Sequence, residues 1–333
     1  MLLLFFLLKI IFIYSHSNNP HKISTFLSNN FKTQARSWFI ERSIKAGIPW
    51  NTYTNYYQSP KIKPSLKNLK LLVEEINMDY PEYYLQPFHG YDQGNMNWLA
   101  SYEGEAATLS ISVNYWENND PKISANWLRN NITHLTNEYI DKYYDFTNEM
   151  NILDIGCSIG ISTEYIKQEY EKHNVTGLDL SPFFLAIALH RNNKNSYNIN
   201  YVHANAEKMP FDNSSFDIIY STFLFHEVPN QPTKQILSEI SRLLKPGGIL
   251  AICDLDPEKL SNRLSESKFR RWSFEVTEPH IYQYYTQNIF NLLHFVNLIN
   301  VKKFNLEPLN SLWLSQKPFP DSFLGTEYDI EEI

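Results

Sequence analysis

Residues 151–180 read NILDIGCSIGISTEYIKQEYEKHNVTGLDL, and this stretch predicts the fold of the chain. A short apolar strand at Ile152–Ile155 leads into a glycine loop, Gly156–Gly160, and a helical run then leads to a second strand, Val175–Leu180. Asp179 lies near the carboxyl end of that second strand. The order of strand, glycine loop, helix, strand and acid is typical of a nucleotide-binding βαβ unit.

The residue types around the loop indicate which nucleotide cofactor it binds. The nicotinamide pattern G-x-G-x-x-G is absent, because its second and third glycines would fall on Ser158 and Ile161. Asp154 precedes the loop, where a carboxylate can face an ammonium group, and the two oxygens of Asp179 can accept both ribose hydroxyls. A ligand with a ribose and an amino acid end, such as S-adenosylmethionine, satisfies both acids. A nicotinamide oxidoreductase is thereby a distant alternative.

The segments that follow carry a resemblance to a known family. ILDIGCSIG and VTGLDLS resemble the first two motifs of class I S-adenosylmethionine-dependent methyltransferases, and three later segments continue the series in order: HANAEKMPF (203–211), SSFDIIYSTFLFHEVP (214–229) and ISRLLKPGGILAICDLDP (240–257). Within that class, the chain is most similar to the methyltransferase type 11-like group. The stretches YYLQPFHGYDQGN, EGEAATLS and TEPHIYQYY further resemble uncharacterised plant plastid methyltransferases.

The resemblance implies a Rossmann-like α/β fold with a mostly parallel seven-stranded sheet in residues 146–333. We expect strands to begin near Ile152, Val175, Tyr201, Phe216, Ile249, Leu298 and Ser311, with Lys245–Gly248 as a tight connection before the fifth and the last two strands as an antiparallel pair at one edge. Residues 61–145 are expected to form a helical cap, with helices at 66–76 and 98–116. The aromatic segment between them, residues 80–100, is either a lid over a ligand or a satellite core.

The resemblance also assigns cofactor-binding roles to individual residues. It implies that the methionine end of S-adenosylmethionine passes Gly156 and Gly160, with Ser158 in the place of the usual central glycine, while Asp154 orients the ammonium group. Asp179 would hold the ribose and Leu180 would pack on the adenine. Three further residues would lie beside the adenine ring, and the first of them replaces a family aspartate: Asn205, Ala206 and Glu207.

His226 is the candidate catalytic residue, because it follows the fourth strand, near the point where the sheet order reverses and ligands bind. It can take a proton from a hydroxyl or carbon acid, or it can be a structural histidine. Other polar residues can either close over the sulfonium centre or pack: His89, Tyr91, Asp92, Glu103 and Glu105. A tyrosine group after the fifth strand, Tyr282, Tyr284 and Tyr285, belongs either to an inserted lid or to the core. The small size of Cys157 explains its presence in the glycine loop. No histidine or cysteine pair has metal-ligand spacing, so the sequence predicts no metal.

The first sixty residues differ from the rest in charge. They hold six of the 29 basic side chains but only one of the 36 acidic ones, so the remainder is more acidic than the whole-chain net of −7. Met1–Ser15 is apolar but shorter than the roughly 20 residues that span a bilayer, and a basic, hydroxyl-rich stretch follows it. Residues 1–60 thus predict a signal and transit segment for a plastid-type organelle reached through the secretory route. The alternatives are the endoplasmic reticulum or an uncleaved membrane anchor.

These observations predict an S-adenosylmethionine-dependent methyltransferase that acts on a small, apolar or aromatic acceptor. The excess of acidic side chains after residue 60 argues against a nucleic-acid partner. No stable membrane span is expected unless the apolar segment at the amino terminus is retained. The alternative is a regulatory or scaffold protein that binds S-adenosylmethionine without turnover.

Overall fold

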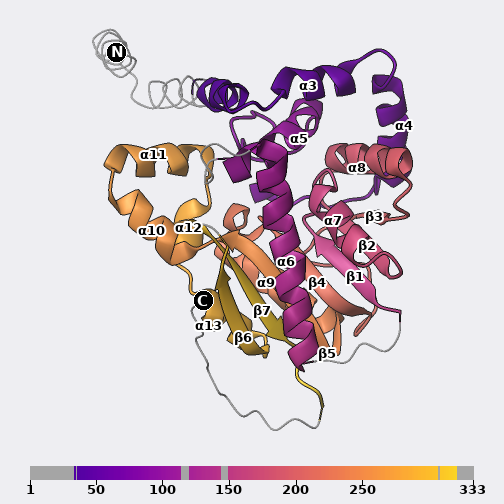
Figure 1. The fold of residues 1–333 in the computed structure, drawn as a ribbon, viewed down its shortest axis with the longest axis vertical. Helices are drawn as coiled ribbons and strands as arrows, with labels where there is room; N and C mark the ends of the chain where they lie inside the picture. The colour runs from indigo at the N-terminus through magenta and orange to yellow at the C-terminus, as the bar shows by residue number, and fades with distance from the viewer. Residues whose placement is uncertain (1–33, 35, 114–119, 144–148, 307, 321–333) are drawn as a thin grey trace.

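The computed structural model describes residues 34, 36–113, 120–143, 149–306 and 308–320. Their centre is one seven-stranded sheet with the strand order β3-β2-β1-β4-β5-β7-β6 (Figure 1). The strands are β1 (Asn151–Ile155), β2 (Asn174–Asp179), β3 (Asn200–His203), β4 (Phe216–Thr222), β5 (Leu244–Leu255), β6 (Ile299–Asn305) and β7 (Asn310–Gln316). The order reverses between β1 and β4, and this is the switch point where ligands bind in open α/β sheets.

The pairing of the strands confirms the predicted sheet. The pairs β1·β2, β1·β4, β2·β3 and β4·β5 are parallel, whereas β7 runs antiparallel to both β5 and β6. Ile152, Leu153 and Ile155 of β1 are fully buried. A strand that is apolar on both faces has to be covered on both faces, which explains why helices lie on either side of this sheet.

The fifth strand begins earlier than the sequence predicts. Residues 245–248 lie inside β5 rather than in a turn before it, and β5 starts at Leu244. The chain continues in the sheet because the Gly247 N–H donates to the Lys317 carbonyl at 2.8 Å and the Lys317 N–H donates to the Gly248 carbonyl at 2.9 Å. Gly247 has a φ of +80°, so the two glycines form an irregularity within the strand.

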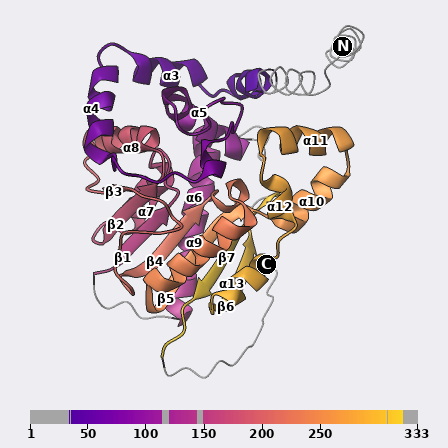
Figure 2. The same cartoon turned by 180° about the vertical axis from the view of Figure 1, so that it is seen from behind.

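Two hydrophobic cores lie on the two faces of the sheet. One core contains apolar side chains of α6 (Pro121–Tyr143), α7 (Ile161–Glu169) and α8 (Pro182–Asn195). The other contains those of α9 (Asn230–Leu243), α10 (Pro257–Ser265), α12 (Ile281–Tyr285) and α13 (Ile289–Phe295), and Figure 2 shows α9 across this face. The α10–α13 helices, with α11 (Lys268–Thr277), form an insertion between β5 and β6.

A helical cap lies over the carboxyl ends of the strands, at the top of Figure 1. It contains α3 (Trp50–Gln58), α4 (Lys63–Val73), η1 (Glu82–Leu85) and α5 (Trp98–Val113), so the two predicted cap helices are present, with α4 beginning and ending three residues early. The last part of the predicted cap, residues 61–145, differs, because α6 packs on a face of the sheet and not over the strand ends. The packed region also begins before residue 61, because residues 36–45 are helical and Ile48 and Trp50 are buried against α5.

No helix in the described part of the chain is both long enough and apolar enough to cross a membrane. The apolar stretch at residues 1–15, on which the predictions of a signal peptide and of an anchor depend, lies outside the described residues.

Candidate active site

The glycine loop after β1 turns back toward β2, and its residues are buried or half-buried. The N–H groups of Gly156 and Cys157 both donate to the Leu178 carbonyl, at 2.8 and 3.0 Å. Gly156 and Gly160 have φ values of +70° and +82°, a region that glycine enters without steric cost. Ser158 is also left-handed, with a φ of +52°, so the residue in the place of the central glycine adopts a backbone conformation that is costly for a non-glycine residue.

Asp179 connects this loop to the end of β2. Its Oδ2 accepts from the Ser158 N–H and its Oδ1 accepts from the Ser181 N–H, both at 2.8 Å. The carboxylate is buried, and burial raises its pKa to about 6 despite these bonds. Each carboxylate oxygen retains a further lone pair, so the predicted contact with two ribose hydroxyls fits this geometry.

Asp154 is a buried carboxylate with one unsatisfied oxygen. Its Oδ2 accepts from the Thr163 hydroxyl at 2.6 Å, whereas its Oδ1 has no hydrogen-bond partner among the described residues. Burial raises the pKa of Asp154 to about 7, and the charge of Asp179 adds to the shift. A buried carboxylate oxygen without a partner is unfavourable unless a cation compensates it. The ammonium group of S-adenosylmethionine fits this requirement.

The loop predicted to lie beside adenine is held mainly by its own polar groups. Asn205 Oδ1 accepts from the Glu207 N–H at 2.9 Å, so a contact with the adenine amine would use the second lone pair of this oxygen. The Glu207 carboxylate accepts from the Tyr83 hydroxyl at 3.0 Å, and Ala206 packs against the hydrophobic core. Glu207 therefore connects this loop to the cap.

His203 provides a second connection between the cap and this loop, and the sequence gives no sign of it. Its Nδ1 accepts from the Glu75 N–H at 2.8 Å, so Nε2 carries the proton and donates to the Leu180 carbonyl at 3.0 Å. Burial lowers the pKa of His203, which favours this neutral form. The histidine thereby positions Leu180, the residue predicted to pack on the adenine.

Residues 80–100 cross the carboxyl ends of β2 and β4, which supports the lid alternative for this segment. Ser181 donates from its hydroxyl to the Asn95 carbonyl at 2.8 Å, and the Asn95 amide donates to Glu227 at 3.5 Å. Burial and the charges of Asp179 and Glu227 raise the pKa of Tyr84 well above its usual range, because this phenol lies between the two acids.

His226 forms a pair with a buried aspartate. It lies in η2 (Phe225–Glu227), directly after β4, and its Nδ1 lies 2.7 Å from Oδ1 of Asp254 at the end of β5. Two backbone N–H groups of η2 donate to Oδ2 of Asp254, which is fully buried. Burial opposes the imidazolium, but the carboxylates of Asp254, Glu227 and Glu278 together outweigh it and raise the pKa of His226 to about 9.

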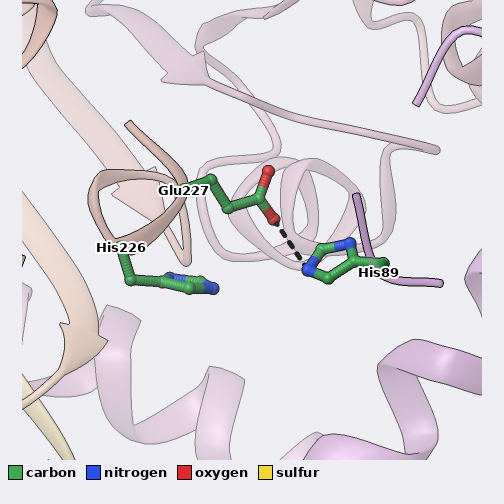
Figure 3. Close-up of side chains that lie close together, drawn as sticks. All are labelled: His89, His226 and Glu227. Atoms are coloured by element: carbon green, nitrogen blue, oxygen red, sulfur yellow. Dashed lines mark ion pairs between the residues drawn. The ribbon is translucent and has the colours of Figure 1, made fainter. Parts of the chain in front are cut away.

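Beside this pair, His89 of the lid contacts the carboxylates of Glu227 and Glu278, the first of which is drawn in Figure 3. Its Nε2 lies 3.6 Å from Glu227 Oε1 and 3.3 Å from Glu278 Oε1, and its backbone N–H donates to the Thr277 carbonyl at 3.2 Å. Burial raises the pKa of Glu227 to about 7. The ring of His226 points toward the same space as His89 and Glu227 in Figure 3. With Glu278, three segments far apart in sequence thus bring their polar groups together.

The other candidate residues serve the packing of the cap. Glu103 accepts from Tyr91 and Arg36, Glu105 accepts from Tyr57 and forms an ion pair with Arg191, and Asp92 is exposed. Among the three tyrosines of the insertion, Tyr284 is a core residue, whereas Tyr282 is exposed and Tyr285 donates to Glu275. Burial raises the pKa of the Cys157 thiol, in keeping with a packing role.

Comparisons with known proteins match the part of the chain that contains this site. Residues 152–248 match the family model described as "Methyltransferase domain". The chain is 32% identical over 133 residues to the phthiotriol/phenolphthiotriol dimycocerosates methyltransferase of Mycobacterium leprae, which covers 38% of this chain and 47% of the relative. It is 38% identical over 104 residues to the uncharacterized methyltransferase sll0829 of Synechocystis sp., and this match covers 31% of this chain and 46% of the relative. The chain thus spans about half the length of these relatives.

A solved structure shows the same fold over a longer stretch. The CurJ carbon methyltransferase covers 77% of this chain and 70% of its own, with a TM-score of 0.51 and 15% identity. The matched domain model begins within β1 and ends in β5, so it includes the glycine loop, Asp179 and His226. From the sheet order, the loop geometry and these matches we conclude that the chain carries a class I, S-adenosylmethionine-dependent methyltransferase domain.

Proposed function

We propose that this protein transfers a methyl group from S-adenosylmethionine to a hydroxyl or an acidic carbon of a small acceptor. The observation that carries this proposal is the His226–Asp254 pair at the carboxyl end of β4. Because Asp254 contacts Nδ1, the other ring nitrogen is left for the acceptor. A histidine that is oriented in this way by a carboxylate has the arrangement of a general base, and it acts as one in the neutral form that follows loss of the proton above its pKa of about 9.

The position of the pair relative to the cofactor loop supports the same role. A side-chain carbon at Gly156 would lie 3.1 Å from Leu224, so the loop that leads to His226 lies directly against the glycine loop. Asn95 connects Ser181, next to the predicted ribose site, with Glu227 beside His226. Donor and acceptor sites are therefore neighbours, as direct methyl transfer requires.

The surroundings of His226 favour an acceptor with an apolar or aromatic body. The Phe223 ring lies 6.4 Å from the His226 ring, and the Phe88 ring lies 3.9 Å from that of His89. When bound, S-adenosylmethionine supplies an electrophilic methyl group on a sulfonium. The protein's own tasks are to align the acceptor, to remove its proton and to exclude water, and the lid serves the last of these.

The proposal is tested first by binding and then by turnover. Calorimetric titration of the full chain with S-adenosylmethionine should show binding at micromolar concentrations, and its absence would overturn the proposal. A panel of phenols, aliphatic alcohols and β-keto acids is then assayed for formation of S-adenosylhomocysteine. Binding without turnover on this panel or on a cell extract would favour the regulatory or scaffold alternative.

We further propose a plastid-type organelle, reached through the secretory route, as the site of action, in keeping with the resemblance to plant plastid methyltransferases. The apolar stretch at residues 1–15 and the hydroxyl-rich residues after it support this address. Because Arg36 binds Glu103 and the chain is packed from Ile48 onward, the targeting segment would be confined to about the first 35 residues. A fluorescent protein fused behind residues 1–35 should reach the organelle, and retention in the endoplasmic reticulum would contradict this proposal.

A further inference from the structure

We infer that the acceptor side of this site binds a divalent transition-metal ion through His89, His226 and Glu227. One ligand atom from each residue lies within 4.8 Å of the others, and Figure 3 shows the two imidazoles and the carboxylate facing one space. The lid supplies His89 and η2 supplies the other two. Because 137 residues separate His89 from His226 in the chain, ligand spacing in the sequence cannot reveal this group.

The distances are close to those of a metal site. Two ligands of a tetrahedral zinc ion lie about 3.4 Å apart, given metal–ligand bonds of about 2.0–2.1 Å. His89 Nε2 and Glu227 Oε1 are 3.6 Å apart. The full set lies within 4.8 Å, so a side-chain movement of about 1 Å at His226 would complete the coordination. The His89 side chain is 35% exposed, which leaves a path for an ion from solvent.

The groups behind the ligands are those that metal-binding histidines use. A ligating histidine commonly donates its other ring nitrogen to a carboxylate, which fixes the tautomer and orients the ring. Asp254 is such a carboxylate partner for His226, because its Oδ1 lies 2.7 Å from Nδ1 of the ring. Oδ2 of Asp254 in turn accepts from two backbone N–H groups. His89 has a left-handed φ of +53°, a costly conformation for a non-glycine residue. The backbone bond to Thr277 keeps it there.

The local charge also favours a cation. Three carboxylates, Asp254, Glu227 and Glu278, surround two imidazoles at this site. Glu278 Oε2 is buried and has no hydrogen-bond partner among the described residues. Buried acids without compensation are unfavourable, and a divalent ion bound by the two neutral imidazoles would supply positive charge beside these carboxylates.

The ligand set indicates the kind of ion and what it would do. Two imidazoles and one carboxylate with an open position suit Zn²⁺ or Fe²⁺ rather than Mg²⁺ or Ca²⁺, which prefer oxygen ligands. At the open position the ion would bind an acceptor oxygen and lower its pKa. His226 would then be a ligand, and the ion would take over the activation of the acceptor. This last role depends on the proposed function, whereas ion binding does not.

The test measures ion binding without S-adenosylmethionine. The full chain, freed of any affinity tag and treated with a chelator, is titrated with Zn²⁺ by calorimetry and with Co²⁺ by visible absorption. We expect one ion per chain with micromolar or tighter affinity, and Co²⁺ bands that show nitrogen ligands. His89→Ala and Glu227→Gln should each weaken binding at least tenfold. Asp254→Asn should weaken it by about 10–100-fold, the usual effect of removing the carboxylate partner of a ligating histidine.

His134→Ala is the matched control, because His134 Nε2 lies 3.4 Å from Glu138 Oε1 in an exposed pair of the same residue types. This variant should bind the ion as the parent does. Absence of stoichiometric binding, or equal binding by the parent and the His89 and Glu227 variants, would overturn the inference. Circular dichroism verifies that each variant is folded, and His89→Gln replaces His89→Ala if the latter is not. If the chain binds Zn²⁺ but not S-adenosylmethionine, only the proposed function is contradicted. If it binds S-adenosylmethionine but not Zn²⁺, only the metal site is contradicted.

Discussion

His226 and Asp254 come from the carboxyl ends of two adjacent parallel strands, β4 and β5, and their side chains meet at 2.7 Å. Asp254 has no exposed surface, whereas 12% of the His226 side chain is exposed. The buried member therefore orients the ring, and the other ring nitrogen is available to a ligand.

This relationship predicts the effect of Asp254→Asn on turnover. An amide cannot stabilise the imidazolium that forms during proton removal, so the rate of S-adenosylhomocysteine formation should fall by about 10²–10⁴-fold. Affinity for S-adenosylmethionine should change less than twofold, since Asp254 is not among its expected contacts. Rapid-quench assays and calorimetry measure the two quantities. Asp217→Asn, a buried acid paired with Lys245 at the opposite end of β4, is the control and should lower stability without lowering the rate.

Asp179→Ala should weaken S-adenosylmethionine binding at least tenfold. The substitution removes the proposed ribose contacts and also the acceptor for the N–H groups of Ser158 and Ser181, and bonds to a charged group contribute about 1.5–3 kcal/mol each. Calorimetry on the variant and on Asp212→Ala, which changes an exposed acid, makes the comparison. Undiminished binding by the Asp179 variant would contradict the assigned role.

The affinity for S-adenosylmethionine should depend on pH through Asp154. Burial and the charge of Asp179 raise its pKa to about 7, while the charge of Arg129 and the Thr163 hydroxyl oppose the shift. The ionised carboxylate is the form that binds an ammonium group, so affinity should rise between pH 5.5 and pH 8. Titrations across this range measure the effect. Asp154→Asn should bind at least tenfold more weakly at pH 8 and should lose most of the dependence on pH.

The same substitution should stabilise the ligand-free protein at neutral pH. When the pKa of a carboxylate is raised in the folded state, the protein loses stability as the pH rises from about 4 to about 7, because the ionised carboxylate is then buried. Asp154→Asn removes that charge and should raise the melting temperature, by about 2–4 °C for each kcal/mol gained. Calorimetric melting at pH 5 and pH 8 is the measurement, and a gain at pH 8 that is no larger than at pH 5 would refute the explanation.

Gly104→Ala should weaken cofactor binding through the glycine loop. A side-chain carbon at this position of α5 would lie 3.2 Å from the Ile159 side chain, so Ile159 would have to move. The higher helix propensity of alanine, worth about 1 kcal/mol, offsets the crowding in the stability of the protein. We therefore expect a several-fold loss of affinity for S-adenosylmethionine with little change in melting temperature. Ile159→Val, which shortens the contacting side chain, should restore affinity in the double variant, and a lack of rescue would contradict this coupling.

The cofactor half of the site could be predicted from the sequence because its parts are local. The glycine loop and Asp179 belong to one βαβ unit, and the backbone conformation that binds a nucleotide requires glycine at fixed positions. The predicted start of β5 was wrong because Gly247 and Gly248 are typical of a turn. Hydrogen bonds with Lys317, which is distant in the chain, keep them in the sheet.

The acceptor half could not be predicted in the same way. His226 was predicted as a candidate, but Asp254 lies in an apolar strand whose pattern does not say what the side chain faces. His89 reaches the site only because the chain is held on either side of it, at Glu75 before the lid and at Asn95 within it, and both residues bond to partners more than 80 positions away. Such contacts depend on the packed fold rather than on local spacing.

The bond from the Glu75 backbone to His203 has a kinetic consequence. It attaches the cap, just before the lid, to the loop that is expected to cover the adenine, while the lid itself carries His89 to the acceptor site. A cofactor that enters beneath the lid has to arrive before His89 takes its place, so we expect ordered addition, with the acceptor second. The spent cofactor would leave last, and reopening of the lid rather than methyl transfer would then limit the steady-state rate.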